Sequence, residues 1–213
     1  MAFLVIIPSR LQSTRLPNKP LANIAGKSMI QRVYEQALKL DDVDVLVACD
    51  GKEIADEVES FGGKAIITNP ILPSGTDRIF AALEKIPNIE KIDFVINLQG
   101  DLPLVEPNII KQLADVMANS NIDMATLACK ASQEEADDPN IVKIAINFMS
   151  DDFGKALYFS RAAIPHSREG QGDFYHHIGI YAYKISTLKK LISLPESPLE
   201  KLEKLEQLRA LEN

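Results

Sequence analysis

Three cations stand close together near the N-terminus: Arg10, Arg15 and Lys19. They follow a short apolar run, and Pro17 and Pro20 restrict the backbone between and after them. A polyphosphate needs compensating charge and donors, which an arginine fork and a lysine point charge supply. The segment has neither the glycines of a dinucleotide-binding fingerprint nor a Walker loop. A solvated basic loop is the alternative, but the position directly after the first strand favours phosphate binding.

A carboxylate, Asp101, stands just beyond a second apolar run, in the segment Asn97-Leu98-Gln99-Gly100-Asp101. Gly100 allows the backbone to approach a neighbour closely. Magnesium sites in proteins commonly use one or two carboxylates together with substrate phosphates. Asp101 is therefore a candidate Mg²⁺ ligand, although an aspartate in this place could equally cap a helix or a turn.

A third polar segment runs from Ser74 to Arg78 and contains Gly75, Thr76 and Asp77. Its composition predicts the start of a helix, with Thr76 or Asp77 as the capping residue. Its hydroxyls and backbone could also bind the edge of a base or a sugar.

Alternating strands and helices position these three segments. Continuous apolar runs predict strands at 3–7, 43–49, 65–68 and 94–98. Amphipathic spacing predicts helices at 28–40, 54–61 and 77–86, and another that begins near Pro107. This order predicts an α/β fold with a mainly parallel sheet flanked by helices. Ligands bind such sheets at the carboxyl ends of the strands, where the cations and Asp101 stand.

The pattern changes after residue 120. Strands are expected at 124–129, 142–146, 156–159 and 178–183, with a polar loop at 165–177 that carries all three histidines. No linker separates two domains, so we expect one domain over 1–213, with a strand excursion at about 120–185 that forms a sugar pocket and a dimer surface.

Ser197 and Pro198 predict the start of a helix that runs to the end of the chain. Its leucines recur every three residues, a row that spirals over roughly 240° of a helix. Such a helix would be buried on more than one side, as between its own domain and a second subunit. Glu200 and Lys204 are spaced as an ordinary solvated i,i+4 pair.

Composition excludes several classes of protein. The net charge of −7 argues against non-specific binding of nucleic acid, which needs excess Lys and Arg. No apolar run approaches the ~20 residues of a membrane span, and no secretory signal is expected. Cys49 and Cys129 stand in apolar runs and are interpreted as buried hydrophobes in a reducing compartment, which predicts a cytoplasmic protein without structural zinc.

The three segments together resemble the CMP-Kdo synthetases, the 3-deoxy-manno-octulosonate (Kdo) cytidylyltransferases, over essentially the whole chain. Three further segments are similar to this branch rather than to nucleotidyltransferases at large: 158–165, 177–181 and 197–209. The resemblance implies a Rossmann-like nucleotide-diphospho-sugar transferase fold, a homodimer and Mg²⁺. It also implies the reaction of CTP with Kdo to give CMP-Kdo and pyrophosphate, for lipopolysaccharide synthesis.

The resemblance assigns roles residue by residue. Nucleotide binding falls to Pro8, Ser9, Arg10, Arg15, Lys19, Ser74 and Arg78. Asp101 would hold the metal and act with Arg10, Arg15 and Lys19 as the catalytic set. The Kdo pocket would be lined by Gln99, Arg161, His177, Tyr181, Glu206 and Gln207. Arg161 suits the sugar carboxylate, and the others suit its hydroxyls.

Alternatives remain at this stage. His177 could be a satisfied structural histidine, and Arg161 could pair with a surface acid. The family's second metal carboxylate lies in a segment that would follow Asn213, so the expected metal site here depends on Asp101 alone. The chain could instead act on another acidic sugar, such as sialic acid, or be a nucleotide-binding protein without catalysis.

Overall fold

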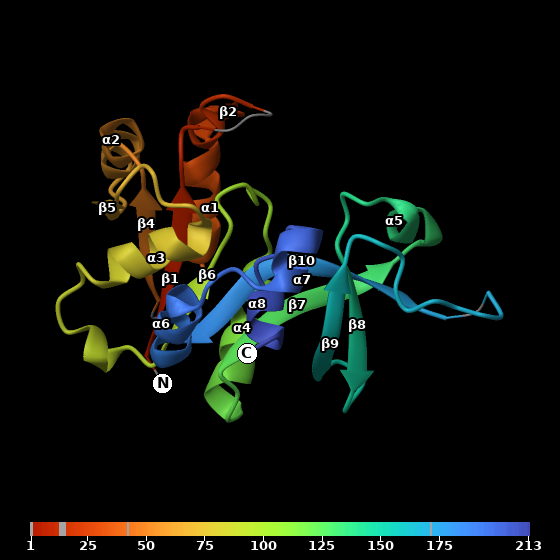
Figure 1. The fold of residues 1–213 in the computed structure, drawn as a ribbon. Coiled ribbons are helices and arrows are strands. Elements are labelled where there is room, and N and C mark those ends of the chain that lie inside the picture. The colour runs from red at the N-terminus through yellow and green to blue at the C-terminus, as the bar shows by residue number, and fades with distance from the viewer. Residues whose placement is uncertain (1, 13–15, 42, 171) are drawn as a thin grey trace. The chain divides into compact units, whose positions relative to one another are not determined.

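The computed structural model describes residues 2–12, 16–41, 43–170 and 172–213. The chain forms two compact units, shown in Figure 1 with the colour running along the sequence. The first unit comprises Met1–Ala125 and Ile180–Ile192, and the second comprises Thr126–Gly179 and Ser193–Asn213. Two strands, β7 (Met124–Ala131) and β10 (Phe174–Lys184), have residues in both units.

A mainly parallel sheet forms the centre of the first unit. Its strand order is β5 (Ala65–Ile67), β4 (Asp44–Cys49), β1 (Phe3–Ser9), β6 (Phe94–Asn97) and the C-terminal part of β10. The first four are parallel and β10 is antiparallel to β6. The central strands are mostly apolar, as expected where helices cover both faces of a sheet. The expected α/β class is confirmed.

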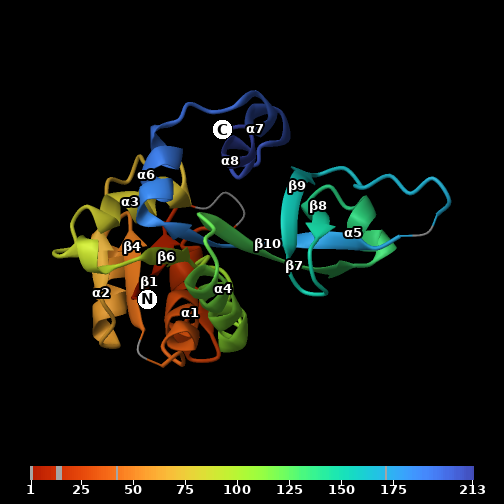
Figure 2. The ribbon, with the colours of Figure 1, turned by 90° about the horizontal axis from the view of Figure 1, so that it is seen from below.

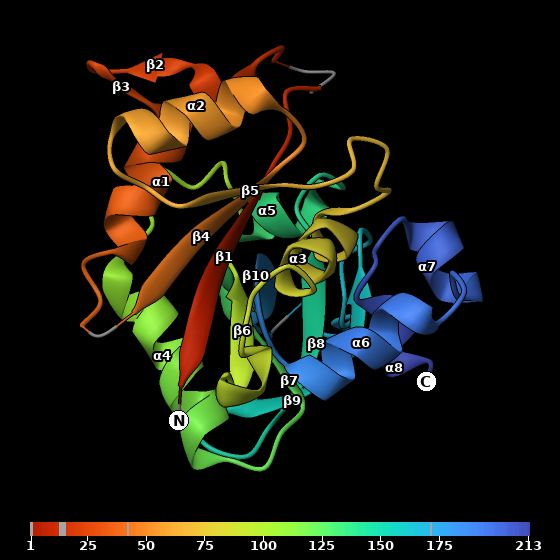
Figure 3. The same ribbon diagram turned by 90° about the vertical axis from the view of Figure 1, so that its left-hand side faces the viewer.

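Helices α1 (Met29–Ala37) and α4 (Pro107–Asn119) lie on one face of this sheet. Helices α3 (Gly75–Leu83) and α6 (Ile185–Ser193) lie on the other, as Figures 2 and 3 show. The remaining elements of the unit are short: η1 (Lys19–Leu21), β2 (Asn23–Ile24), β3 (Lys27–Ser28), α2 (Lys52–Ser60) and η2 (Ile89–Lys91). Helix α6 was not predicted, and it follows β10 without an intervening turn.

The second unit is built on antiparallel strands. β8 (Lys143–Phe148) pairs with β9 (Gly154–Ser160), and both β8 and β7 pair with β10. Its helices are α5 (Gln133–Asp137), α7 (Pro198–Glu203) and α8 (Leu208–Leu211). The core joins the β8–β9 hairpin to the C-terminal segment through Ile144, Phe159, Leu205 and Leu208.

The prediction of one continuous C-terminal helix is wrong. Lys204 adopts the left-handed conformation, with φ 55° and ψ 47°, and ends α7. The break rotates the leucines apart: Leu208 is fully buried, whereas Leu202 is 79% exposed. The leucine spacing therefore does not describe one helix face, since the segment is divided between α7 and α8. Ser197 does cap α7, in a reciprocal capping box with Glu200.

Two smaller predictions are also corrected. Cys49 is fully buried in β4 as expected, but Cys129 is exposed, because it lies in the solvent-facing stretch 128–130 of β7. The polar loop ends earlier than residue 177, since β10 begins at Phe174 and includes His176 and His177.

Candidate functional site

The end of β1 and the segment after β6 approach closely at Gly100. A Cβ atom on Gly100 would lie 3.0 Å from the carbonyl oxygen of Pro8 and 3.4 Å from Ile7 Cγ2. The Leu98 N–H donates to the Ile6 carbonyl at 3.0 Å, which continues the ladder beyond the strand. Glycine therefore allows the segment that carries Asp101 to pack against the end of β1.

Lys19 and Asp101 meet at this edge of the sheet. Lys19 Nζ donates to Asp101 Oδ2 at 2.5 Å, and both side chains are partly exposed to solvent. The predicted phosphate-binding cation and the predicted metal ligand thus lie in direct contact. Arg15, the other cation predicted in this loop, lies outside the described residues.

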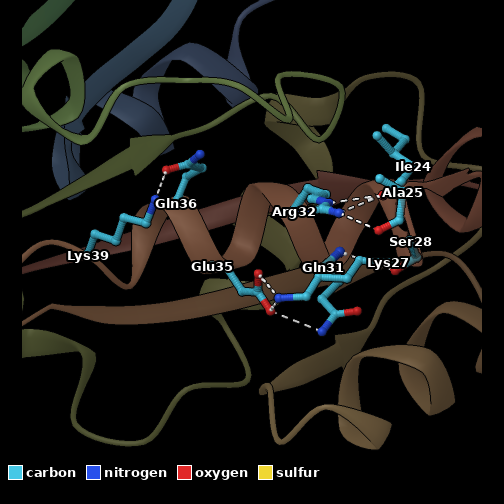
Figure 4. A network of polar contacts seen from close by, with 9 residues as sticks. All are labelled: Ile24, Ala25, Lys27, Ser28, Gln31, Arg32, Glu35, Gln36 and Lys39. Carbon is cyan, nitrogen blue, oxygen red and sulfur yellow. Dashed lines mark hydrogen bonds and ion pairs between the residues drawn. The ribbon is translucent and has the colours of Figure 1, made fainter.

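A polar network fastens the segment that follows Lys19 (Figure 4). Arg32 on α1 donates to the carbonyl oxygens of Ile24 and Ala25 in the β2–β3 turn. Lys27 Nζ lies 2.7 Å from both carboxylate oxygens of Glu35. The hydrogen bond and charge of Lys27 hold the pKa of Glu35 below its usual value. The hairpin is therefore attached to α1 at two points.

Ser74 and Arg78, which were predicted on the nucleotide side, both bond groups close to them in the sequence. Ser74, rather than Thr76 or Asp77, caps α3: its hydroxyl accepts from the Asp77 N–H at 3.1 Å and donates to the Asp77 carboxylate. Arg78 is only 2% exposed, and its Nη1 donates to Thr68 Oγ1 and to the Asn69 carbonyl. Arg78 therefore fixes the segment that follows β5 and does not present its guanidinium to solvent.

The three predicted residues at the end of β1 differ in exposure. Pro8 packs beside the start of α3, where a Cβ on Gly75 would lie 3.3 Å from Pro8 Cγ. Ser9 is buried, and its hydroxyl has no hydrogen-bond partner in the described part of the chain. Arg10 is exposed at the edge of the sheet. Of the three, only Arg10 presents a charged group to solvent there.

Two residues predicted on the sugar side belong to the first unit. Gln99 Nε2 lies 3.5 Å from Asn97 Oδ1, the last residue of β6. Tyr181 is the β10 partner of Asn97 across the ladder, and its ring stacks on Tyr183 with centroids 5.7 Å apart. Gln99 and Tyr181 are thus both placed next to Asn97.

In the second unit, Arg161 follows β9 and is held by backbone carbonyls. Its Nε donates to the Glu203 carbonyl at 2.9 Å and its Nη1 to the Pro139 carbonyl at 3.0 Å. The Glu203 carboxylate accepts from the Arg161 N–H and from the Ser160 hydroxyl. The guanidinium therefore forms no ion pair with a surface acid within the described residues, and two of its nitrogens are fixed.

His177 is 7% exposed in β10. Its Nε2 lies 3.0 Å from Thr126 Oγ1, and that hydroxyl is 3.1 Å from the Ile178 carbonyl. Because the single hydroxyl hydrogen points to Ile178, the ring donates through Nε2. Burial, together with the charge of His176, lowers the pKa of His177 to about 4, so the ring is neutral near pH 7.

Glu206 and Gln207 stand in the turn between Leu205 and Leu208, the two core leucines of the C-terminal segment. Gln207 is 7% exposed at the start of α8. A nearby ion pair stabilises this segment: Arg209 donates to both carboxylate oxygens of Glu200, at 2.8 and 2.5 Å. The expected solvated pair of Glu200 with Lys204 is therefore wrong.

Several residues of these clusters were not predicted. Asp50 directly follows β4 and accepts from the Leu11 N–H, and its position resembles that of Asp101 after β6. The position of Asp50 directly after a predicted strand is the sequence feature that could have identified it. Glu203 and Thr126 gave no signal, since their roles depend on contacts with residues 42 or more positions away.

The oxygen donors at the sheet edge suit a hard cation. Asp101 supplies an accessible carboxylate, as a Mg²⁺ site requires. Among residues 2–12, 16–41, 43–170 and 172–213, no three His, Cys, Asp or Glu side chains gather as a metal cluster. Within the same residues, no helix is long and apolar enough to cross a membrane.

Comparison with known proteins identifies the class first. The sequence model of the family described as cytidylyltransferase matches residues 4–213. The chain belongs to the cytidylyltransferase family.

Its relatives place it more narrowly. The chain is 47% identical to the 3-deoxy-manno-octulosonate cytidylyltransferase of Rhodospirillum rubrum, over 99% of this chain and 83% of that protein. It is 43% identical to the protein of the same name from Paramagnetospirillum magneticum, over 99% and 85% of the two chains. Within the family, the chain belongs with the 3-deoxy-manno-octulosonate cytidylyltransferases.

Solved structures agree. The structure of CMP:2-keto-3-deoxy-manno-octonic acid synthetase complexed with CTP has a TM-score of 0.92 and 41% identity, covering 100% of this chain and 86% of that one. A cytidylyltransferase from Leptospira borgpetersenii has a TM-score of 0.59 and 16% identity, covering 99% and 71%, and supports the fold alone.

Proposed function

We propose that the chain transfers the cytidylyl group of CTP to Kdo, releasing pyrophosphate and forming CMP-Kdo for lipopolysaccharide synthesis. The observation that carries this proposal is the 47% identity, over nearly the whole chain, to a protein named for this activity. The 41% identical structure complexed with CTP supports the choice of nucleotide.

The triphosphate would bind at the carboxyl edge of the first unit's sheet. Arg10 is exposed there, and Lys19 lies beside the Gly100–Asp101 turn. Arg15 completes the predicted set. Ser74 and Arg78 would act on the cytidine side by fixing the backbone after β5 and at the start of α3.

Kdo would meet side chains suited to an acidic sugar. Arg161 has its Nε and Nη1 fixed by carbonyls, so its orientation is set before a carboxylate binds. In the second unit, neutral His177, Glu206 and Gln207 would serve the hydroxyls. Their donor and acceptor groups suit a polyhydroxylated ligand. Gln99 and Tyr181, in the first unit, stay predictions of the resemblance.

The reaction requires positioning and charge neutralisation more than covalent help from a side chain. A hydroxyl oxygen of Kdo forms the new bond to the α-phosphorus as the bond to the β-phosphate oxygen breaks. The bonding electrons leave with pyrophosphate, and the hydroxyl proton passes to solvent. Lys19 and Arg10 would stabilise the charge on the phosphates.

Asp101 would hold the Mg²⁺, which supplies charge neutralisation and lowers the pKa of a bound hydroxyl. A cytoplasmic location is part of the proposal, because it is where CTP is made available to such a transferase. We also propose a homodimer through the β8–β9 hairpin. Phe148, Met149 and Leu157 are between 41% and 62% exposed on this hairpin, and exposed apolar side chains are common at interfaces.

The decisive assay measures pyrophosphate released from CTP and Mg²⁺ with a panel of acidic sugars. Kdo alone should support release, and sialic acid should not. Pyrophosphate release with sialic acid but not with Kdo would overturn the assignment of Kdo as the substrate. CTP binding without pyrophosphate release for any sugar would indicate a non-catalytic protein. Light scattering of the chain tests the dimer, with L157K expected to give monomers and K111E, at an exposed position on α4, as its control.

A further inference from the structure

Asp50 lies at the carboxyl end of β4, next to the segment that leaves β1. Its two carboxylate oxygens lie 3.2 and 3.1 Å from the backbone nitrogen of Leu11. The two residues are 39 positions apart in the sequence. Asp50 directly follows β4 and Leu11 stands two residues after β1, and in these paired parallel strands Ser9 is the partner of Cys49. The Asp50 carboxylate therefore connects the end of β4 to the segment that follows β1.

The same Leu11 also closes the loop on its other side. The Asn18 N–H donates to the Leu11 carbonyl at 3.2 Å, and the Leu21 N–H donates to the Asn18 carbonyl at 2.9 Å. Both backbone polar groups of Leu11 are thus engaged at the base of the segment 11–18. Lys19 begins η1 directly after Asn18, so the Leu11 anchor fixes where Lys19 leaves the loop.

The charge of Asp50 suits this place. Arg10 and Arg78 both stand close enough to influence each other electrostatically, and Asp50 opposes their repulsion: burial lowers the pKa of Arg78, and the Asp50 charge raises it. A carboxylate at the base of a cationic loop therefore helps to keep the cations together when no phosphate is bound. A backbone N–H bonded to a charged acceptor is also held more firmly than one bonded to a neutral group.

We propose that Asp50 is a positioning residue for the triphosphate: it anchors Leu11 so that the loop presents Arg10 and Lys19 to the β- and γ-phosphates of CTP. The inference rests on the proposed function, because it takes the loop to be the triphosphate site. Asp50 itself does not touch the nucleotide. Its loss should weaken interactions with the phosphates and leave those with the nucleoside intact.

The experiment compares D50L, D50N and a control, D56N, in the full chain. Leucine is similar in size to aspartate but accepts no hydrogen bond, whereas asparagine keeps one acceptor oxygen without the charge. Asp56 is an exposed acid on α2 that pairs with Lys52. Calorimetry measures the Kd of CTP and of cytidine for each variant, and steady-state assays measure the KM for CTP and for Kdo.

D50L should bind CTP about tenfold or more weakly, and D50N about threefold more weakly. Cytidine affinity and the KM for Kdo should change by less than about twofold in both, and D56N should match the wild type. The role of Asp50 would be overturned if D50L lost affinity for CTP and cytidine equally. It would also be overturned if D50L bound CTP as tightly as the wild type does. If D50L fails to fold, D50N decides alone, and CTP binding equal to that of D56N overturns the proposal.

The wild type separates this inference from the function beneath it. A wild-type chain that binds no CTP refutes both the proposed function and the role of Asp50. A wild-type chain that binds CTP and releases pyrophosphate, with Asp50 variants that behave like D56N, refutes only the role of Asp50.

Discussion

Lys19 Nζ lies 2.5 Å from Asp101 Oδ2, which joins the loop after β1 to the turn after β6 across 82 positions of sequence. The two side chains are 33% and 46% exposed, so solvent screening limits their contribution to stability to below about 1 kcal/mol. A large effect of either residue on activity would therefore arise from substrate or metal binding rather than from folding. The first two predictions depend on this difference between effects on activity and effects on stability.

K19A should raise the KM for CTP about tenfold or more, because it removes a charge-assisted bond to the triphosphate. The free energy of unfolding should change by less than about 1 kcal/mol. The control is K39A, whose lysine lies just beyond α1 and donates from Nζ to the Gln36 side chain. Steady-state kinetics and urea unfolding check both quantities, and equal KM values in the two variants would contradict the phosphate-loop assignment.

D101N keeps the shape of the side chain but removes the anionic metal ligand. Turnover should fall by about tenfold or more at fixed Mg²⁺ and recover in part as Mg²⁺ is raised, with stability close to that of the wild type. D115N is the matched control, since Asp115 forms an exposed pair with Lys111 on α4. If D101N keeps normal turnover but unfolds more easily, Asp101 is a structural cap.

R161K retains the charge but loses the fork that bonds the Pro139 and Glu203 carbonyls. The KM for Kdo should rise more than the KM for CTP, because the cation is no longer held in one orientation. R168K, in an exposed part of the same unit, serves as the control. A change confined to the KM for CTP would place Arg161 on the nucleotide side.

R209M should destabilise the second unit strongly. The side chains of Arg209 and Glu200 are only 11% and 8% exposed, and removal of one partner leaves a buried carboxylate without its cation. Burial raises the pKa of Glu200, but the hydrogen bonds from Arg209 and the Ser197 N–H, with the charge of Arg209, outweigh this and lower the pKa below its usual value. The carboxylate is therefore charged at pH 7. We expect a loss of about 3 kcal/mol or more in urea unfolding. The double variant E200Q/R209M should recover part of the lost free energy of unfolding. The control R168M should leave the free energy of unfolding almost unchanged.

His177 makes stability depend on pH. Its pKa is lowered from 6.5 in the unfolded chain to about 4 in the folded protein. Above pH 6.5 both states are neutral and the group contributes no pH dependence. As the pH falls from 6.5 to 4 the unfolded state takes up the proton first, so stability falls, by about 2 kcal/mol at pH 5. Urea unfolding of the wild type and H177Q at pH 7 and 5 should show a smaller loss in H177Q. The exposed histidine variant H166Q should lose as much as the wild type.

Much of the fold follows from local sequence. The apolar runs that became β1, β4 and β6 are buried on both faces, and such runs need no distant information to be recognised. Gly100 and Asp101 were placed correctly at a strand end, because the carboxyl ends of parallel strands share one edge. The capping box of Ser197 and Glu200 likewise depends on residues three positions apart.

Partner choice required the tertiary structure. Local spacing offered Glu200 the side chain of Lys204, but Lys204 turns into the left-handed conformation and Arg209 reaches Glu200 instead. The sequence left open that Arg161 pairs with a surface acid, but its Nε and Nη1 bond the carbonyls of Glu203 and Pro139 instead. The sequence determined most of the strands and helices of the parallel sheet, because burial periodicity and capping are local. Only the tertiary structure decided which polar groups meet, because each buried donor or acceptor takes whichever partner packing brings within reach.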